Sequence, residues 1–176
     1  MNLTVYGVWN TTAGADSSLS TVGSNTGNYY TGEEADNVFD NSLNSKYTSF
    51  GVCNSSAGAI AAYCGVNTGF YFTVDSSAIL LAGMRFGTPA ALPSRDPITL
   101  TVEGSNQTPS VLSLGTSWTL FYNGSTGLNA NPGRRAYGLR VNFTNSISYS
   151  SYRFLITSIR GVDTATQYAE VQLFGY

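Results

Sequence analysis

The chain has 176 residues, enough for one domain of ordinary size, and it contains no histidine. Charged residues make up only 10% of it, against about 25% in typical domains, and the formal net charge is −2. This balance gives no electrostatic basis for binding nucleic acid or an anionic lipid surface. No apolar run approaches the ~20 residues of a membrane span, so we expect no membrane insertion. The lack of histidine excludes the Ser-His and Cys-His pairs that activate nucleophiles.

The N-terminal part begins with one alternating segment and continues without a period. Residues 3–9 alternate loosely and predict a first strand. Residues 10–31 are rich in Thr, Ser, Gly and Asn, and they are too many for an ordinary hairpin loop. We therefore expect a long loop with a functional or capping role. The first ten residues lack the basic and apolar regions of a secretory signal, which predicts that no such signal is present.

The next segment, residues 33–51, concentrates oxygen-bearing side chains. Four of the chain's ten acidic residues fall in its first eight positions, and asparagines and serines follow them. Carboxylate, amide, hydroxyl and carbonyl oxygens on a turn-prone segment are the ligands that a hard cation such as calcium prefers. The segment is not an EF-hand loop, because it lacks the alternating ligands, the central glycine and the glutamate at the twelfth position. The same residues also fit a solvated acidic loop built from Asx-turns.

The two cysteines, Cys53 and Cys64, lie close together in the sequence. They predict a disulfide that closes a small loop and contributes about 2–3 kcal/mol. The composition is that of a protein exposed to an oxidising exterior, which favours this pairing. The alternative is a pair of buried free thiols. The spacing matches no metal-binding motif.

Short strand-like runs recur at regular spacing through the rest of the chain. Three of the five prolines fall in residues 88–97, so this stretch must be a loop. With the first strand this makes about eight strands and no convincing helix. The pattern predicts an all-β fold, a two-sheet antiparallel sandwich of the jelly-roll kind. The expected strands after the first are 69–75, 79–87, 98–106, 117–124, 137–143, 152–161 and 168–175.

Four motifs occur in an order that is typical of one superfamily. The early turn ADNVFDNSLNSKY offers Asp40, Ser45 and Tyr47 as its acid, hydroxyl and aromatic residues. RDPITLTVEGSN and SWTLFYNGSTGL match two middle strands, and YRFLITSIRG with AEVQLFG match the close. The chain thus resembles the discoidin, or coagulation-factor type C, superfamily of galactose-binding-like jelly rolls, which includes many carbohydrate-binding modules. We expect one domain over 1–176, with a strand and long loop over 1–32 and a family-like core over 33–176.

The resemblance also implies a structural calcium between the early acidic turn and the last strand. Glu170 supports this independently, because it is the only acid in that expected strand and its neighbours are apolar. The alternative places Glu170 toward solvent on the polar side of the strand. Carried over by position, the implied ligands are the Asp40 and Glu170 carboxylates, the backbone carbonyls of Asn37, Ser42 and Ala169, and Ser45 through its carbonyl or hydroxyl.

Candidate ligand-binding residues must come from loops. Galactose binders of this group usually use a histidine, which this chain lacks, so the resemblance does not supply galactose specificity. Loop arginines and aromatic residues suit a pyranose ring, through stacking and bidentate hydrogen bonds. They suit protein contacts equally well. The candidates are Tyr29, Tyr30, Arg134, Arg135 and Tyr137.

The chain is poorly equipped to be an enzyme, and we expect no catalytic residue. A two-carboxylate glycosidase would have to draw on acids such as Glu33, Glu34, Asp36 and Glu103, but calcium explains the clustered acids better. The leading interpretation is a non-catalytic, lectin-like module for adhesion, which binds cell-surface glycan in the extracellular space. The alternative is a structural protein of a virion surface, as decoration or fibre, or of extracellular matrix, whose loops contact neighbouring protein subunits. The missing secretory signal fits this alternative.

Overall fold

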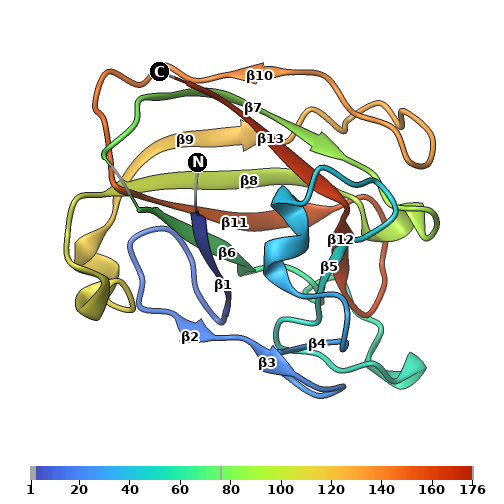
Figure 1. Cartoon of the computed structure of the whole chain (residues 1–176). Helices are drawn as coiled ribbons and strands as arrows, with labels where there is room; N and C mark the ends of the chain where they lie inside the picture. Colours follow the sequence, from blue (N-terminus) through green and yellow to red (C-terminus); the bar gives the residue numbers. More distant parts are fainter. Residues whose placement is uncertain (1–2, 76, 176) are drawn as a thin grey trace.

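The computed structural model describes residues 3–75 and 77–175, which form two packed β-sheets (Figure 1). The larger sheet contains β1 (Leu3–Trp9), β2 (Ser18–Leu19), β6 (Thr68–Val74), β8 (Pro97–Ser105), β9 (Thr119–Ser125) and β11 (Ser151–Ile159). The smaller sheet contains β7 (Leu81–Gly87), β10 (Val141–Asn142) and β13 (Glu170–Gly175). Two short pairs of strands complete the set: β3 (Thr21–Val22) with β4 (Asn28–Tyr29), and β5 (Tyr47–Ser49) with β12 (Thr166–Tyr168).

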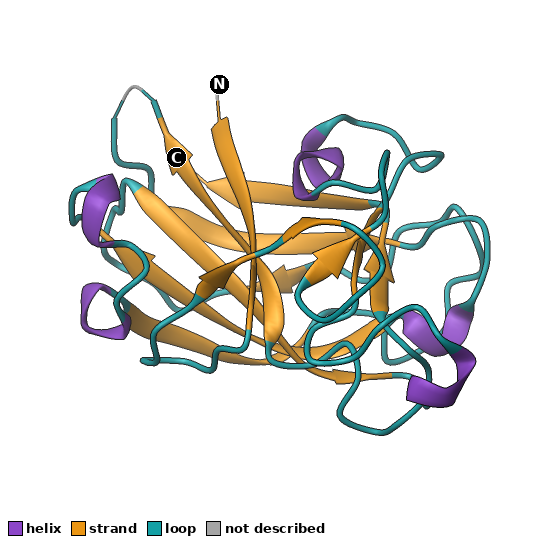
Figure 2. Ribbon diagram, turned by 90° about the horizontal axis from the view of Figure 1, so that it is seen from below, coloured by secondary structure: helices purple, strands orange, loops and turns teal. Residues whose placement is uncertain are grey.

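The strand order is that of an antiparallel sandwich. The larger sheet runs β2-β1-β6-β11-β8-β9 and the smaller one runs β10-β7-β13. All pairs within these two sheets are antiparallel, so the expected all-β, two-sheet jelly roll is confirmed. Five short 3-10 helices lie toward the ends of the strands (Figure 2). They are η1 (Ala35–Phe39), η2 (Ala57–Ala59), η3 (Pro93–Arg95), η4 (Pro109–Val111) and η5 (Gly115–Ser117).

The strand boundaries differ from the sequence prediction at both ends of the chain. The expected strand 168–175 corresponds to β13, and only its first residue, Tyr168, belongs to β12, which pairs with a different strand. The expected strand 137–143 is reduced to the two residues of β10. The expected loop 10–31 contains β2, β3 and β4. Where the sequence predicted no helix, the structure forms short 3-10 turns and, over the described residues, no α-helix.

The main core fills the space between the two sheets and is rich in aromatic side chains. Phe70 of β6 and Phe154 of β11 stack with their ring centroids 5.1 Å apart. Phe86 of β7 and Tyr168 of β12 meet edge to face at 5.2 Å. Such pairs bury large apolar areas and contribute beyond simple burial. All four residues belong to the main core cluster, which includes side chains from both sheets.

A second, smaller cluster covers the outer face of the larger sheet. Tyr71 and Leu155 point outward from β6 and β11, and Trp118 packs over them. The indole Nε1 of Trp118 donates a hydrogen bond to the Leu112 carbonyl at 2.9 Å. Because loops seal this face as well as the core face, β6 and β11 are buried on both sides.

One end of the sandwich gathers most of the long loops. Strand register places Trp9 beside Thr68 and Ile159 beside Pro97, so these strand ends lie together. The loops that begin or end there are called the loop end below, and they lie at the right in Figure 1. They comprise residues 50–67, 88–96, 126–140 and 160–165.

Candidate functional site

The acidic turn after η1 is built by side-chain hydrogen bonds to its own backbone. Asp40 accepts the Ser42 N–H at 2.8 Å and also accepts the Ser45 hydroxyl. Asn41, between them, has a φ of 60°, a left-handed conformation that asparagine tolerates better than most residues. The Asn37 side chain donates to the Lys46 carbonyl at 2.8 Å and closes the turn. The turn is therefore an Asx-turn, the structure that the sequence offered as the alternative to a metal site.

Glu170, at the start of β13, lies beside this turn and is buried. Glu170 is only 2% exposed, and its Oε2 atom has no hydrogen-bond partner among the described residues. Burial, and then repulsion from the neighbouring Asp40 carboxylate, raise the pKa of Glu170 to about 7. Backbone N–H groups, including those of Asn41 and Ser42, partly oppose this rise. The acidic turn and the last strand thus bring two carboxylates together.

Gly87 of β7 allows the turn to dock so closely. A Cβ atom at this position would lie 2.5 Å from the Leu43 side chain and 3.3 Å from the Glu170 Cβ. A distance below 3.0 Å is too close, so any larger residue here would require the Leu43 side chain to shift from its place against the smaller sheet. The smaller sheet therefore positions both the acidic turn and Glu170.

The donor atoms around this turn fit a hard cation. Two carboxylates lie close together, and one of them has a buried oxygen without a hydrogen-bond partner. The turn adds neutral oxygens of the kind that a hard cation binds. In residues 3–75 and 77–175 no cluster of three or more His, Cys, Asp or Glu side chains occurs, so carbonyl and hydroxyl oxygens would have to complete the shell. Asn37, Ser42 and Ser45 lie on the turn, and the buried Ala169 lies immediately before Glu170.

A cavity of about 400 Å³ opens beside Glu170, between the smaller sheet and β1. Its lining is mainly apolar and includes Leu3, Phe39, Ile79 and Leu173. Glu170 and Asn41 supply polar atoms to its lining. The cavity lies at the open edge of the sandwich, where β13 has a strand neighbour on one side only.

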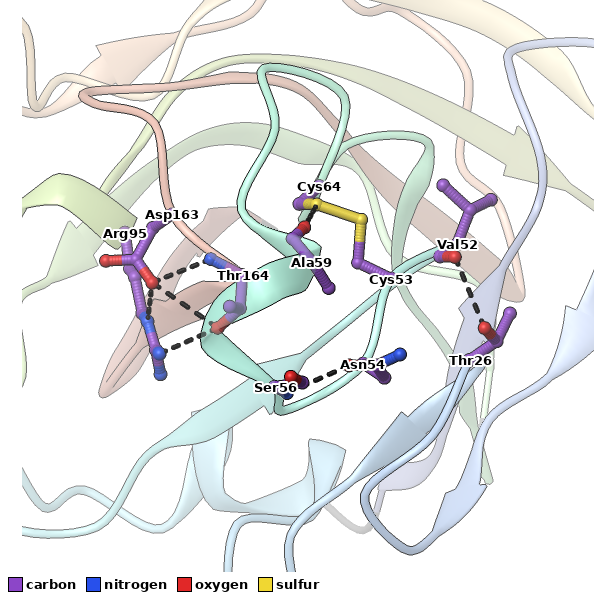
Figure 3. Close-up of a disulfide and its surroundings, with 10 residues drawn as sticks. All are labelled: Thr26, Val52, Cys53, Asn54, Ser56, Ala59, Cys64, Arg95, Asp163 and Thr164. Atoms are coloured by element: carbon purple, nitrogen blue, oxygen red, sulfur yellow. Dashed lines mark hydrogen bonds and ion pairs between the residues drawn. A yellow bond between two sulfur atoms is a disulfide. The ribbon is translucent and has the colours of Figure 1, made fainter.

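The disulfide loop forms one side of the loop end (Figure 3). Cys53 and Cys64 are bonded, with their Cα atoms 5.4 Å apart. The Thr26 hydroxyl donates to the Val52 carbonyl at 3.2 Å, which ties the start of this loop to the N-terminal segment. Ser56 caps η2 by accepting the Gly58 N–H. The loop is therefore held at several points along its length.

Asp163 fastens the far side of the disulfide loop. Ala61 forms an isolated antiparallel bridge with Asp163, and Arg95 Nε donates to the Asp163 carboxylate at 2.8 Å (Figure 3). Burial by itself would raise the pKa of Asp163, but the Ser94 hydroxyl, the Arg95 guanidinium and the Thr164 N–H together lower it. Arg95 is thus a structural residue that joins three loops.

Exposed apolar side chains gather around this bridge. Tyr63 has 63% of its surface exposed, the largest value among the aromatic residues that the structure describes. Ile60 and Val162, on the two segments joined by the bridge, are also exposed, and Val52 lies at the start of the same loop. An exposed aromatic side chain on a rigid support, with exposed apolar residues on the adjoining segments, is a candidate interaction site. Sequence reasoning missed Tyr63, since nothing in the sequence separates it from the other eleven tyrosines.

The structure separates the predicted ligand-binding residues into different places. Tyr29 packs edge to face on Tyr47 and lines a cavity of about 260 Å³ near η1. Tyr30 packs edge to face on Phe50 with ring centroids 4.9 Å apart. No hydrogen bond or aromatic contact in the described part of the chain joins these tyrosines to the segment 134–137.

Within that segment, Arg134 is held by a buried acid, Arg135 is exposed, and Tyr137 packs on the smaller sheet. Arg134 Nη1 donates to Asp96 Oδ1 at 2.7 Å, and Asp96 is fully buried. Arg135 is exposed and has a φ of 51°. Tyr137 forms an isolated bridge with Gly87 and lies beneath the Arg85 guanidinium.

The acids considered for catalysis do not form a site. Glu103 is fully buried in an ion pair with Arg153. Glu33 is paired with Lys46 at 3.1 Å. Glu34 accepts the Gly32 N–H at 3.0 Å, while Asp36 is exposed on η1. Glu34 and Asp36 line the same cavity as Tyr29, but Glu103 and Glu33 are engaged elsewhere.

Solved structures share this architecture over nearly the whole chain. A family 32 carbohydrate-binding module from Clostridium perfringens, solved in complex with galactose, matches with a TM-score of 0.57 and 12% identity, over 97% of this chain and 92% of its own. The discoidin fold predicted from four motifs is confirmed. The chain has the discoidin fold. A module from a family 31 glycoside hydrolase of the same organism gives 0.60 and 15%, over 89% and 90% of the two chains.

The discoidin fold is also that of an F5/8 type C domain from Bacteroides fragilis, which matches with a TM-score of 0.55 and 12% identity over 81% of this chain and 80% of its own. No protein-family model and no curated protein matches the sequence. At these identities the likeness establishes the fold, and the ligand must be argued from this chain's own residues. Within the described ranges, no helix has the length and apolar character needed to cross a membrane.

Proposed function

We propose that this protein is a single-domain, non-catalytic carbohydrate-binding module that holds sugar at the loop end, against Tyr63. The observation that carries the proposal is an exposed tyrosine on a loop closed by a disulfide, at the loop end of a fold shared with carbohydrate-binding modules. A tyrosine supplies a large, flat contact surface at a low cost in side-chain entropy. The hydroxyl keeps a polar atom available for hydrogen bonds.

The support beneath Tyr63 favours binding over a merely solvated loop. The Cys53–Cys64 bond and the bridge between Ala61 and Asp163 fix the loop before any ligand arrives. Preorganisation lowers the entropy lost on binding, which raises affinity without new contacts. Ile60 and Val162, next to the two bridged residues, add further exposed apolar side chains. A sugar ring with one apolar face and hydroxyl groups at its rim suits such a surface.

We also propose that a structural calcium joins the acidic turn to β13. The ion would neutralise two neighbouring carboxylates, and their oxygens would coordinate it. The protein's own residues prepare this by burying Glu170 beside Asp40 and by leaving the Glu170 Oε2 atom without a partner in the described chain. The ligands would be Asn37, Asp40, Ser42, Ser45, Ala169 and Glu170.

An extracellular environment is part of the same proposal. A disulfide persists outside the cytosol, and the low charge content and many polar neutral residues are compatible with an exterior protein. The partner would accordingly be a cell-surface or matrix glycan. The described structure adds nothing specific in favour of the alternative role in a virion or as a matrix protein.

The test is affinity electrophoresis in gels that contain neutral polysaccharides such as galactan, xylan or glucan. The wild-type protein should be retarded in at least one gel, and Tyr63→Ala should remove most of that retardation. Ile147→Ala is the matched control, because Ile147 is an exposed apolar residue on the connection between β10 and β11, away from the loop end. Equal retardation of wild type and Tyr63→Ala would reject the loop end as the sugar site.

A further inference from the structure

Three of the eight basic residues have no carboxylate partner in the described part of the chain. They are Arg85, Arg135 and Arg140. All three lie on the smaller sheet or on the segment that leads into it. The other five basic residues each form an ion pair: Lys46, Arg95, Arg134, Arg153 and Arg160.

Strand register puts two of these arginines side by side. Arg85 of β7 pairs with Gln172 of β13. On the other side of β7, Val141 pairs with Met84, so Arg140, one residue earlier, lies next to Arg85. Met84 belongs to the core, and residues alternate between faces, so Arg85 and Arg140 both point away from the core. Like charges on adjacent strands, about 5 Å apart, destabilise a sheet unless something neutralises them.

Both guanidinium groups are held in place by neighbouring side chains. Arg85 donates from Nε and Nη2 to the Gln172 Oε1 atom, at 3.1 and 2.5 Å, and its guanidinium carbon lies 4.3 Å from the Tyr137 ring centroid. Arg140 lies 4.1 Å from the ring centroid of Phe174, reaching across β7 at Gly83, which has no side chain. An arginine stacked on a ring keeps the N–H groups at its edge free for other acceptors.

These donors remain free in the described structure. The Arg85 Nη1 group and the whole Arg140 guanidinium make no hydrogen bond to residues 3–75 or 77–175. Glu170 and Asp40 act electrostatically on Tyr137 of this face, but neither forms an ion pair with Arg85. Two oriented, unpaired guanidinium groups match the geometry of carboxylate or sulfate oxygens.

We propose that this arginine face, made by Arg85, Arg140, Tyr137, Phe174 and Gln172 with Arg135 at its margin, binds the anionic groups of an acidic polysaccharide. The face belongs to β7, β10 and β13, at the top of Figure 1, whereas Tyr63 belongs to the loop between η2 and β6, so this inference does not depend on the proposed loop-end site. A duplex nucleic acid is the less suitable polyanion. Its binding generally needs many phosphate contacts, whereas this chain offers three unpaired arginines and a net charge of −2.

The experiment compares four soluble polymers at neutral pH with millimolar calcium present throughout. Polygalacturonate carries carboxylates, chondroitin sulfate carries sulfates as well, dextran is neutral, and a short duplex DNA carries phosphates. We expect binding to the first two, none to dextran, and progressive loss of binding as sodium chloride is added. Arg85→Gln combined with Arg140→Gln should weaken binding at least about tenfold. Using Arg140→Lys in place of Arg140→Gln should recover only part of the binding, because lysine restores the charge without the planar stacked group.

Lys46→Gln is the control for the loss of positive charge as such, because Lys46 is a partly exposed basic residue on a different segment. It should bind like wild type, and so should Tyr63→Ala. Melting temperatures within a few degrees of wild type will establish that the variants are folded. Unchanged binding by the double arginine variant, or equal binding to dextran, would overturn the proposal. Tighter binding to the DNA than to both acidic polysaccharides would do so as well.

Discussion

Arg153 of β11 and Glu103 of β8 stand directly opposite each other and form an ion pair in which both side chains have no solvent exposure. The Nε–Oε2 distance is 2.7 Å. Glu103 also accepts the Gly14 N–H at 2.7 Å, and Arg153 donates to the Ala15 carbonyl at 3.0 Å. This one pair therefore fastens the N-terminal loop over the outer face of the larger sheet.

Breaking this pair should be costly. Arg153→Met or Glu103→Gln alone leaves a buried charge without its partner, and each should lower the free energy of unfolding by about 3–5 kcal/mol. Glu103→Leu combined with Arg153→Met removes both charges and should cost clearly less than the sum of the single changes. Denaturant unfolding followed by tryptophan fluorescence measures this, since Trp118 packs against Arg153. Losses below about 1 kcal/mol in both single variants would contradict the assigned role.

Calcium removal should destabilise the protein through the acidic turn. At a hundredfold excess over Kd a bound ion adds roughly 2.7 kcal/mol, so EDTA should lower the melting temperature by about 5–10 °C. Asp40→Ala and Glu170→Gln should each abolish that sensitivity. Asp36→Ala is the matched control, since Asp36 is an exposed acid of the same segment outside the proposed ligand set. A melting curve that ignores both EDTA and added calcium would eliminate the metal site.

Reduction of the disulfide should affect stability and sugar binding together. Cys53→Ser combined with Cys64→Ser should cost about 2–3 kcal/mol, the value expected for a loop of this length. Retardation in the polysaccharide gel should fall as well, because Tyr63 would no longer be held rigidly. Mass spectrometry of the unreduced protein provides the check on the bond itself. Two alkylatable thiols in that experiment would remove the basis of the prediction.

The Asp163 carboxylate should make stability sensitive to acid. Its hydrogen bonds lower its pKa below the ordinary value of 3.8, so its stabilising effect is complete above about pH 4 and is lost as the pH falls through the lowered pKa. Asp163→Asn should cost about 1–3 kcal/mol at neutral pH and should show a weaker loss of stability in acid. Melting temperatures across an acid pH series measure both effects. If the variant loses stability in acid as steeply as the wild-type protein, other carboxylates dominate the acid dependence of stability.

The sequence was most informative where a side-chain pattern decides the outcome locally. The regular spacing of short apolar and β-branched runs predicted β6, β8 and β11, because strands buried in a sandwich leave such runs between turn residues. The resemblance of the acidic turn to the family motif indicated that Asp40 and Glu170 would meet, and the structure brings them together. The strands β5 and β12 were not predicted, because each is three residues long and forms only through pairing with a distant partner.

The residues that sequence reasoning missed are defined by tertiary contacts. Glu103 and Arg153 are each the lone charge in an otherwise uncharged strand, which is a signal for a buried pair that was available and unused. Arg134 looked like a loop residue free to bind ligand, but Asp96 engages it from 38 positions away. Tyr63 and the row formed by Arg140 and Arg85 depend on exposure and on register, which no local pattern supplies.

A glycan array tests the central claim most directly. The wild-type protein with calcium should bind a reproducible set of immobilised glycans, and those glycans should be recovered chemically unchanged after long incubation. Tyr63→Ala should lose the neutral members of that set, while the exposed control Ile147→Ala should retain them. Failure of the folded wild-type protein to bind any glycan, with a normal melting curve as proof of folding, would contradict its assignment as a carbohydrate-binding module.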